Sequence, residues 1–183
     1  MTYSIKRRIV WWGIALLFSG AIGLFVLLWL NSVDDEPTPE DIDTISSVFG
    51  DVTCAGITDF QEQVTCIRGL QTLLRMQIPD MRCADRNINI EPPQFVDRGY
   101  GCCFDRARIL EKALKHMGYE VRRLALFDSS SHQSLTLAVP GVPSHATLEV
   151  LTSKGWMGVD SNELFVLVDK ENMSPLTYQD IPS

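Results

Sequence analysis

The residues best suited to covalent chemistry in this sequence are a cysteine, a histidine and an aspartate that lie far apart along the chain: Cys103, His145 and Asp160. Cys103 lies where an irregular segment, 97–101, meets the start of a predicted helix. At that position the helix dipole and the free backbone N–H groups of the first turn favour a thiolate, and the same groups can stabilise an oxyanion. A buried structural cysteine is the alternative interpretation.

A reactive thiol needs a base, and the chain has three histidines. His116 lies thirteen residues further along the same predicted helix, which is ~20 Å at the rise of an α-helix and therefore out of reach. His132 lies in a serine-rich loop and stays possible. His145 opens a predicted strand, where an isolated histidine is more often a surface or hydrogen-bonded residue than a base.

A predicted hairpin brings His145 and Asp160 together. Two strand-like segments flank a tight turn, and pairing of Thr152 with Gly155 sets their register. Side chains alternate along a strand, so this register puts His145 and Asp160 on one face as diagonal neighbours, roughly 7–8 Å apart at the backbone. A loop one residue longer or shorter would move Asp160 to the other face. The three residues would then form a nucleophile, a base and an orienting group.

Four segments in this region resemble motifs of the transglutaminase-like superfamily, in the order in which that family has them. Residues 101–107 (GCCFDRA) resemble G-x-C-x-D-x-A, and residues 118–122 resemble the G-x-x-x-R that follows. The H-A-x-x-E strand is matched by residues 145–149, and the G-W-x-x-x-D strand by residues 155–160. The resemblance covers about residues 99–163.

This resemblance implies a papain-like fold in which Cys103 is the nucleophile, His145 the base and Asp160 the orienting group. The family contains protein cross-linkers, peptidases, amidases and inactive relatives. Thr147 stands where many members have tryptophan, and Cys102 is an unusual neighbour for a nucleophile. These departures leave the substrate class and the activity open.

The resemblance also directs attention to residues around the nucleophile. An oxyanion would be held by the backbone of Cys103, with Tyr100 or Gln94 as candidates for the second donor. Asp105 and Arg122 match family positions, and we expect both to be structural rather than catalytic.

The cysteine count fits one free thiol and two disulfides. The chain has five cysteines, and setting Cys103 aside leaves Cys54, Cys66, Cys83 and Cys102, which can pair in three ways. The local pair Cys54–Cys66, with Cys83–Cys102 as the second, is the favoured interpretation. Four separate thiols are the alternative, and a Cys102–Cys103 bond would block the nucleophile or make it a redox switch.

Cys102, Cys103, His145 and Asp160 are also chemically acceptable zinc ligands. Paired CxxC spacing is missing, however, and adjacent cysteines rarely serve one tetrahedral centre. The sequence has no nucleotide, flavin or calcium motif. We therefore expect neither a metal nor a cofactor.

Hydrophobic periodicity predicts helices first and strands later, which is typical of an α+β domain with an antiparallel sheet. Helices are expected over 39–49, with Thr38 as N-cap, from Thr58 to before Pro79, and over 103–117. Residues 78–101 are expected to be mostly loop. Strands are expected over 120–127, 134–139, 145–151, 156–160 and 164–169.

Residues 9–30 form a run of 22 residues without a charge, enough to cross a ~30 Å hydrocarbon core as a helix. The run exceeds the ~7–15 apolar residues of a signal peptide, which favours an uncleaved anchor. Basic residues precede it and acidic residues follow it, so residues 1–8 are expected in the cytoplasm and the rest outside. Residues 31–38 would be a linker and 39–183 the transglutaminase-like domain. In a bacterium the anchor would lie in the inner membrane and the domain would lie in the oxidising periplasm.

The net charge of −7 makes the chain a poor binder of nucleic acid. The leading hypothesis is a membrane-anchored cysteine hydrolase or acyltransferase that acts on amide or ester bonds of a protein or peptide near the bilayer. The alternatives are an inactive domain that binds a membrane protein or another envelope partner, and a thiol redox protein that uses Cys102 and Cys103.

Overall fold

The computed structural model describes residues 11–12, 17–26, 34–79, 91–127 and 144–181. The chain divides into two compact units, Met1–Asp34 and Asp35–Ser183. The second unit is an α+β domain in which the described residues form a three-stranded antiparallel sheet in the order β1-β2-β3, which confirms the predicted α+β class and antiparallel pairing. Its elements are α2 (Pro39–Phe49), α3 (Phe60–Gln77), α4 (Pro92–Arg98), α5 (Cys103–His116), β1 (Val121–Phe127), β2 (Ser144–Thr152), β3 (Gly155–Val159) and the short 3-10 helix η1 (Tyr178–Asp180).

The prediction of a single-pass membrane protein with an exported domain is contradicted. Within the residues that the structure describes, no helix is both long and apolar enough to cross a membrane. Residues 9–10, 13–16 and 27–30 of the predicted span lie outside the described residues.

The start of α2 is as predicted, whereas the start of α3 is not. The Thr38 hydroxyl accepts a hydrogen bond from the Asp41 backbone N–H at 3.2 Å, and the Asp41 carboxylate accepts one from the Thr38 N–H at 2.9 Å. In α3 the N-cap is Asp59 rather than Thr58, because the Asp59 carboxylate accepts from the Glu62 N–H at 3.0 Å. A carboxylate caps a helix as well as a hydroxyl does.

Helix α4 corrects the prediction of a mostly loop segment over 78–101 for residues 92–98, and residues 80–90 of that segment lie outside the described residues. Pro92 and Pro93 occupy the first two positions of α4, where a residue without a backbone N–H fits because the first turn has no intrahelical acceptor for one. The helix ends at Gly99, which adopts a left-handed conformation with φ of 77°.

The strands around the hairpin form where they were predicted, but the last predicted strand does not. Residues 164–169 contribute only two isolated bridges, Val159 with Val166 and Val168 with Pro175. The predicted strand 134–139 lies outside the described residues.

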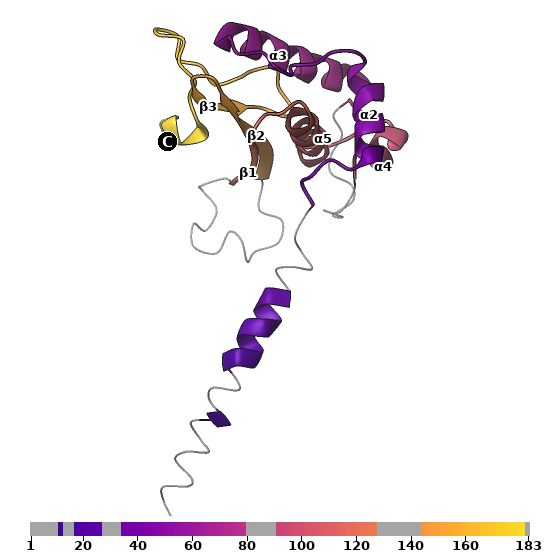
Figure 1. The fold of residues 1–183 in the computed structure, drawn as a ribbon, viewed down its shortest axis with the longest axis vertical. Helices are drawn as coiled ribbons and strands as arrows, with labels where there is room; N and C mark the ends of the chain where they lie inside the picture. Colours follow the sequence, from indigo (N-terminus) through magenta and orange to yellow (C-terminus); the bar gives the residue numbers. More distant parts are fainter. Residues whose placement is uncertain (1–10, 13–16, 27–33, 80–90, 128–143, 182–183) are drawn as a thin grey trace, which may run out of the picture. The chain divides into compact units, whose positions relative to one another are not determined.

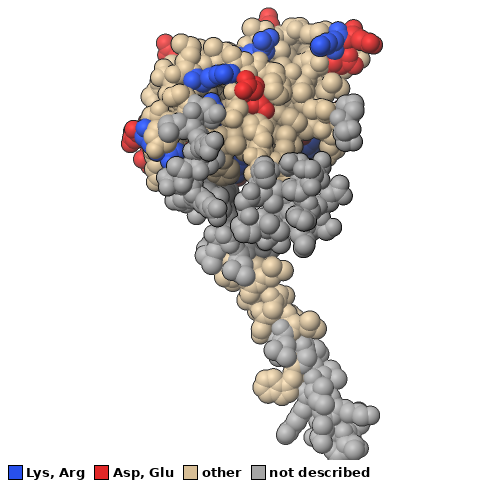
Figure 2. Space-filling model, turned by 180° about the vertical axis from the view of Figure 1, so that it is seen from behind, with Lys and Arg blue, Asp and Glu red and all other residues tan. Residues whose placement is uncertain are grey.

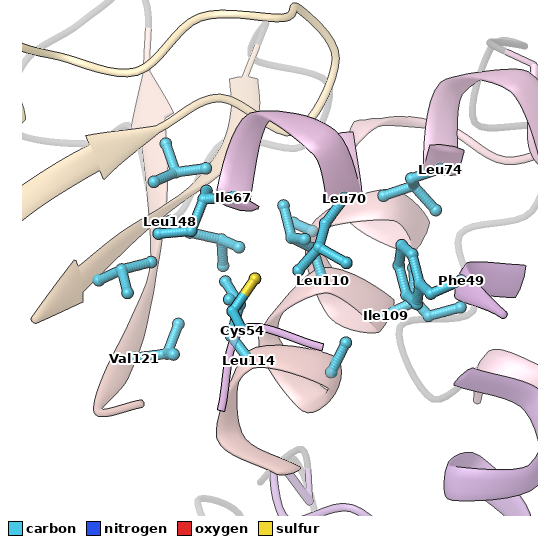
Figure 3. Close-up of a cluster of buried hydrophobic side chains, with 14 of the residues drawn as sticks. Phe49, Cys54, Ile67, Leu70, Leu74, Ile109, Leu110, Leu114, Val121 and Leu148 are labelled. Atoms are coloured by element: carbon cyan, nitrogen blue, oxygen red, sulfur yellow. The ribbon is translucent and has the colours of Figure 1, made fainter. Parts of the chain in front are cut away.

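Helix α5 occupies the middle of the domain. It packs on β1 and β2 on one side and on α2 and α4 on the other, with α3 alongside (Figure 1). The apolar core lies between α5, α3 and the sheet, as Figure 3 shows, and the Cys54–Cys66 disulfide attaches the segment before α3 to that helix. The core residues labelled there are Phe49, Cys54, Ile67, Leu70, Leu74, Ile109, Leu110, Leu114, Val121 and Leu148.

The other face of the sheet is covered by the C-terminal segment. Gly158 in β3 permits this approach, because a Cβ there would lie 2.5 Å from Leu167 Cδ1 and 3.0 Å from Tyr178 Cε2. Figure 2, which views the molecule from behind the side seen in Figure 1, shows acidic and basic side chains interspersed over the described surface in view, without a broad patch of one sign.

Candidate active site

The ends of three secondary-structure elements, α5, β2 and β3, lie at the same end of the domain. The chain reverses direction at the turn around Gly118, so β1 runs antiparallel to α5. The start of α5 therefore lies at the end where β1 finishes, β2 begins and β3 finishes, since each strand is antiparallel to its neighbour. Cys103, His145 and Asp160 are located at these three places.

The predicted hairpin register is confirmed. Thr152 pairs with Gly155 and Leu148 pairs with Val159. The side chains of His145 and Asp160 meet just beyond the paired residues, with His145 Nε2 2.7 Å from Asp160 Oδ2. The Asp160 side chain is buried at 5% exposure and that of His145 is 32% exposed, so the pair has one protected partner and one partner that a ligand can reach.

Hydrogen bonds to both its side chain and its backbone hold Asp160 in place. Its second carboxylate oxygen, Oδ1, accepts hydrogen bonds from the backbone N–H groups of Asn162 and Glu163, both at 2.7 Å. The Gln71 side-chain amide of α3 donates to the Asp160 carbonyl at 2.7 Å. These contacts fix the oxygen that faces the histidine, which is the task of an orienting group in a catalytic set.

The carboxylate also sets the tautomer of the imidazole. A carboxylate oxygen accepts hydrogen bonds, so in the neutral form of the imidazole His145 Nε2 carries the hydrogen and Nδ1 presents its lone pair. Nδ1 is therefore the nitrogen that can take a proton from a thiol.

Cys103 is the first residue of α5 and is partly exposed. Within the described residues it is the one cysteine outside a disulfide. The preceding N-cap, Cys102, donates its backbone N–H to the Asp105 carboxylate at 3.1 Å, and Arg98 donates to the same oxygen at 2.9 Å. Asp105 therefore stabilises the start of the helix that carries the thiol, in line with the structural role expected for it.

No hydrogen bond joins Cys103 to His145 in the part of the chain that the structure describes. Strand alternation explains this separation. Leu148 lies on the face of β2 that packs against α5, whereas Thr147 lies on the opposite face, in contact with Tyr178. His145 is two residues from Thr147 in β2 and therefore lies on the same face as Thr147, opposite the face that packs against α5.

The two proposed oxyanion donors have other partners. The Gln94 side-chain oxygen accepts the Glu91 backbone N–H at 3.3 Å and so caps α4. The Tyr100 ring lies under the Arg98 guanidinium, 4.7 Å from its carbon to the ring centroid. Neither contact brings a donor to Cys103. The backbone N–H of Cys103 is one of the first-turn groups that have no acceptor inside the helix.

Tyr178 is a neighbour of the site that sequence reasoning missed. Its hydroxyl is 2.5 Å from the hydroxyl of Thr147, which itself donates to the Val159 carbonyl at 2.9 Å. Burial raises the pKa of Tyr178 to about 12, and the negative charge of Asp160 adds to the effect. The Tyr178 hydroxyl therefore stays neutral in ordinary buffers. Its position 31 residues from Thr147 left no local signal in the sequence.

Glu149 anchors the same covering segment. One carboxylate oxygen accepts the Tyr178 backbone N–H at 2.9 Å, and the other accepts Arg122 Nε at 2.6 Å. The Arg122 guanidinium also stacks on the Trp156 ring. Arg122 therefore has the structural role expected for it, and Glu149 shares that role.

The disulfide prediction is confirmed for Cys54–Cys66. Cys102 is also disulfide-bonded, which contradicts the alternative of four separate thiols. Cys83, the predicted partner of Cys102, lies outside the described residues, as does His132.

The described residues contain no group of three or more histidine, cysteine, aspartate or glutamate side chains arranged to hold a metal ion. No protein-family model matches the chain, and no curated protein matches it either.

Proposed function

We propose that the domain is a cysteine hydrolase or acyltransferase that acts on amide or ester bonds through a thioester on Cys103. The observation that carries the proposal is the His145–Asp160 pair, with its 2.7 Å hydrogen bond, at the same end of the layers as a free thiol on the first turn of α5. The resemblance to the transglutaminase-like superfamily and its papain-like fold supports the same assignment.

In the first half-reaction His145 Nδ1 takes the proton of the Cys103 thiol. The sulfur attacks the carbonyl carbon of the substrate, a C–S bond forms, and the carbonyl electron pair moves to oxygen. First-turn N–H groups of α5, including that of Cys103, are placed to hold this oxyanion. Collapse of the intermediate breaks the bond to the leaving nitrogen or oxygen, which takes the proton from His145.

In the second half-reaction His145 takes a proton from water or from an amine. The nucleophile attacks the thioester carbon, the C–S bond breaks, and the proton returns to the sulfur of Cys103. Asp160 keeps the imidazole in one tautomer through both steps. The class of acceptor decides whether the reaction is hydrolysis or acyl transfer.

Acetylation by p-nitrophenyl acetate tests the proposal, because it needs only the thiol and its base. We expect a burst of p-nitrophenol and the mass of one acetyl group on the peptide that contains Cys103. His145→Ala should slow acetylation by at least about a hundredfold, the usual contribution of a general base.

His116→Ala is the matched control, because His116 is exposed at the far end of the same helix, and this variant should acetylate like the wild type. Cys103→Ala should abolish the burst. Equal acetylation rates in the wild type and His145→Ala would contradict the proposed enzyme and favour a binding domain that keeps the fold without the chemistry.

A further inference from the structure

Arg106 is a buried cation one turn along α5 from the candidate nucleophile. Its residue is 1% exposed, and positions three apart lie on the same face of a helix. A buried guanidinium loses its hydration, so such a residue is costly unless its hydrogen bonds are made. Leu110, four residues further along the same face, is an apolar core residue, which makes a cation at position 106 unexpected from packing alone.

One of its hydrogen bonds crosses to the loop after β3. Arg106 Nη2 donates to the side-chain oxygen of Asn162 at 2.8 Å. The backbone N–H of the same asparagine donates to Asp160 Oδ1 at 2.7 Å. The other carboxylate oxygen of Asp160 then meets His145. A continuous series of contacts therefore runs from the helix that carries the thiol to the imidazole.

We propose that Arg106 is a positioning residue for the thiol and the imidazole, acting as a clasp between the first turns of α5 and the loop that holds Asp160. For its catalytic meaning this inference rests on the proposed function. Cys103 lies on the first turn of α5 and His145 at the start of β2, so the distance between them depends on how the start of α5 sits against residues 160–163. A misplacement of about 1 Å in such a pair can cost about a hundredfold in rate.

The chain offers a matched control on the same loop. Arg75 of α3 forms an ion pair with Glu163 at 3.1 Å, and both side chains are about half exposed or more, at 49% and 61%. Arg75→Met removes an arginine contact from this loop without opening the core. A general loss of surface charge near the site would affect Arg75 and Arg106 variants alike, whereas the clasp concerns Arg106 alone.

The first measurement is the dependence of acetylation on the histidine, which is the ratio of the p-nitrophenyl acetate rates with and without His145→Ala in each background. We expect this ratio to stay at the wild-type value in Arg75→Met and to fall toward one in Arg106→Met. Asn162→Ala breaks the same hydrogen bond from its partly exposed side and should also lower the ratio. Asn162→Ala can therefore replace Arg106→Met in this test if Arg106→Met fails to fold.

The double variant Arg106→Met/Asn162→Ala should be no slower than the slower single variant, because both changes remove the same Arg106–Asn162 hydrogen bond. A purely structural arginine would slow the reaction without changing the histidine ratio. An unchanged ratio in Asn162→Ala, or losses that add in the double variant, would overturn the clasp.

Hydrogen exchange of the backbone amides of Asn162 and Glu163 provides a readout that needs no enzymatic activity. The clasp predicts faster exchange at both amides in Arg106→Met and Asn162→Ala, and no change in Arg75→Met. If wild-type acetylation shows no dependence on His145, the proposed function fails and this exchange measurement alone decides the clasp. Unchanged exchange in both variants would refute the clasp whatever the acetylation result.

Discussion

Two sets of close contacts between titratable side chains in the domain differ in what they can do. The first is the His145–Asp160 pair at the open end of the sheet. The second, which we call the helix charge cluster, consists of Asp41, Glu91, Arg108 and Lys112 and joins α2, α4 and α5. Lys112 Nζ lies 2.6 Å from an Asp41 oxygen and 2.7 Å from a Glu91 oxygen, and Arg108 also contacts Glu91.

The difference between the two sets is access. Lys112 is fully buried at 0% exposure, whereas the His145 side chain is 32% exposed. A sealed cation can only hold helices together, because no ligand reaches it. A partly exposed imidazole with one nitrogen free can exchange a proton. Similar distances therefore serve stability in one set and, in our proposal, chemistry in the other.

The largest expected effect is that of Asp160→Asn on the rate of Cys103 acetylation. The asparagine oxygen can still accept from the N–H groups of Asn162 and Glu163, but its NH2 would face His145 Nε2. The imidazole would then carry its hydrogen on Nδ1 and could not accept the thiol proton. We expect acetylation of Cys103 to fall by roughly a thousandfold or more, with the free energy of unfolding changed by only about 1 kcal/mol.

Paired acetylation assays and urea titrations measure these two quantities. An Asp160→Asn protein that acetylates at the wild-type rate would place Asp160 among the purely structural groups.

The opposite pattern is expected for Lys112→Met. This change leaves Asp41 and Glu91 facing each other without their shared cation, and removal of one partner from a buried ion pair costs about 3–5 kcal/mol. Urea unfolding should show this loss, while the fraction that remains folded should acetylate normally. A stable Lys112→Met protein with slow acetylation would break the distinction between the two sets.

Gly158→Ala should have a smaller effect on the side of the sheet opposite α5. The added methyl group would lie 2.5 Å from Leu167 Cδ1, and overpacking of this kind costs about 1–3 kcal/mol. Gly69→Ala is the control, because nothing lies within 4 Å of a Cβ there and alanine suits the interior of α3. Thermal unfolding should show Gly158→Ala destabilised and Gly69→Ala unchanged or stabilised.

The smallest effect is the acid dependence of the helix charge cluster. Burial opposes ionisation of Asp41, but hydrogen bonds from Lys112 and Thr38 outweigh it and hold the pKa of Asp41 below its ordinary value of 3.8. The resulting stabilisation is fully present above pH 3.8 and disappears as the pH falls through the lower folded-state pKa. Asp41→Asn should therefore be less stable than the wild type at neutral pH, and the gap should narrow below pH 3.8.

Urea titrations at a series of pH values test this expectation. A gap that stays constant into strong acid would show that Asp41 contributes no charge-dependent stability.

The contacts that the sequence predicted are short-range. The turn between Thr152 and Gly155 fixed the hairpin register, and from it the meeting of His145 with Asp160. The cap of α2 involves Thr38 and Asp41, which are three residues apart. In each case a local rule of hydrogen bonding decides the geometry.

The contacts that the sequence did not predict are long-range. Lys112 finds Asp41 across 71 residues, and Arg106 finds Asn162 across 56. Hydrophobic periodicity marks charged positions as solvent-facing, and only the packing of α2 and α4 over α5 turns them inward. Helix α4 was missed because seven residues are too few to show a helical period.

The burial of α5 has a consequence for how specificity can change. Its residues from Asp105 to Leu114 are all buried, so the helix cannot slide or rotate without disturbing every neighbour at once. In the function that we propose, the Cys103 sulfur on this helix therefore keeps one position whatever acyl group arrives. A different substrate must then be accommodated by changes in the residues around Cys103. Substrate selectivity can change in this way while the position of the thiol stays the same.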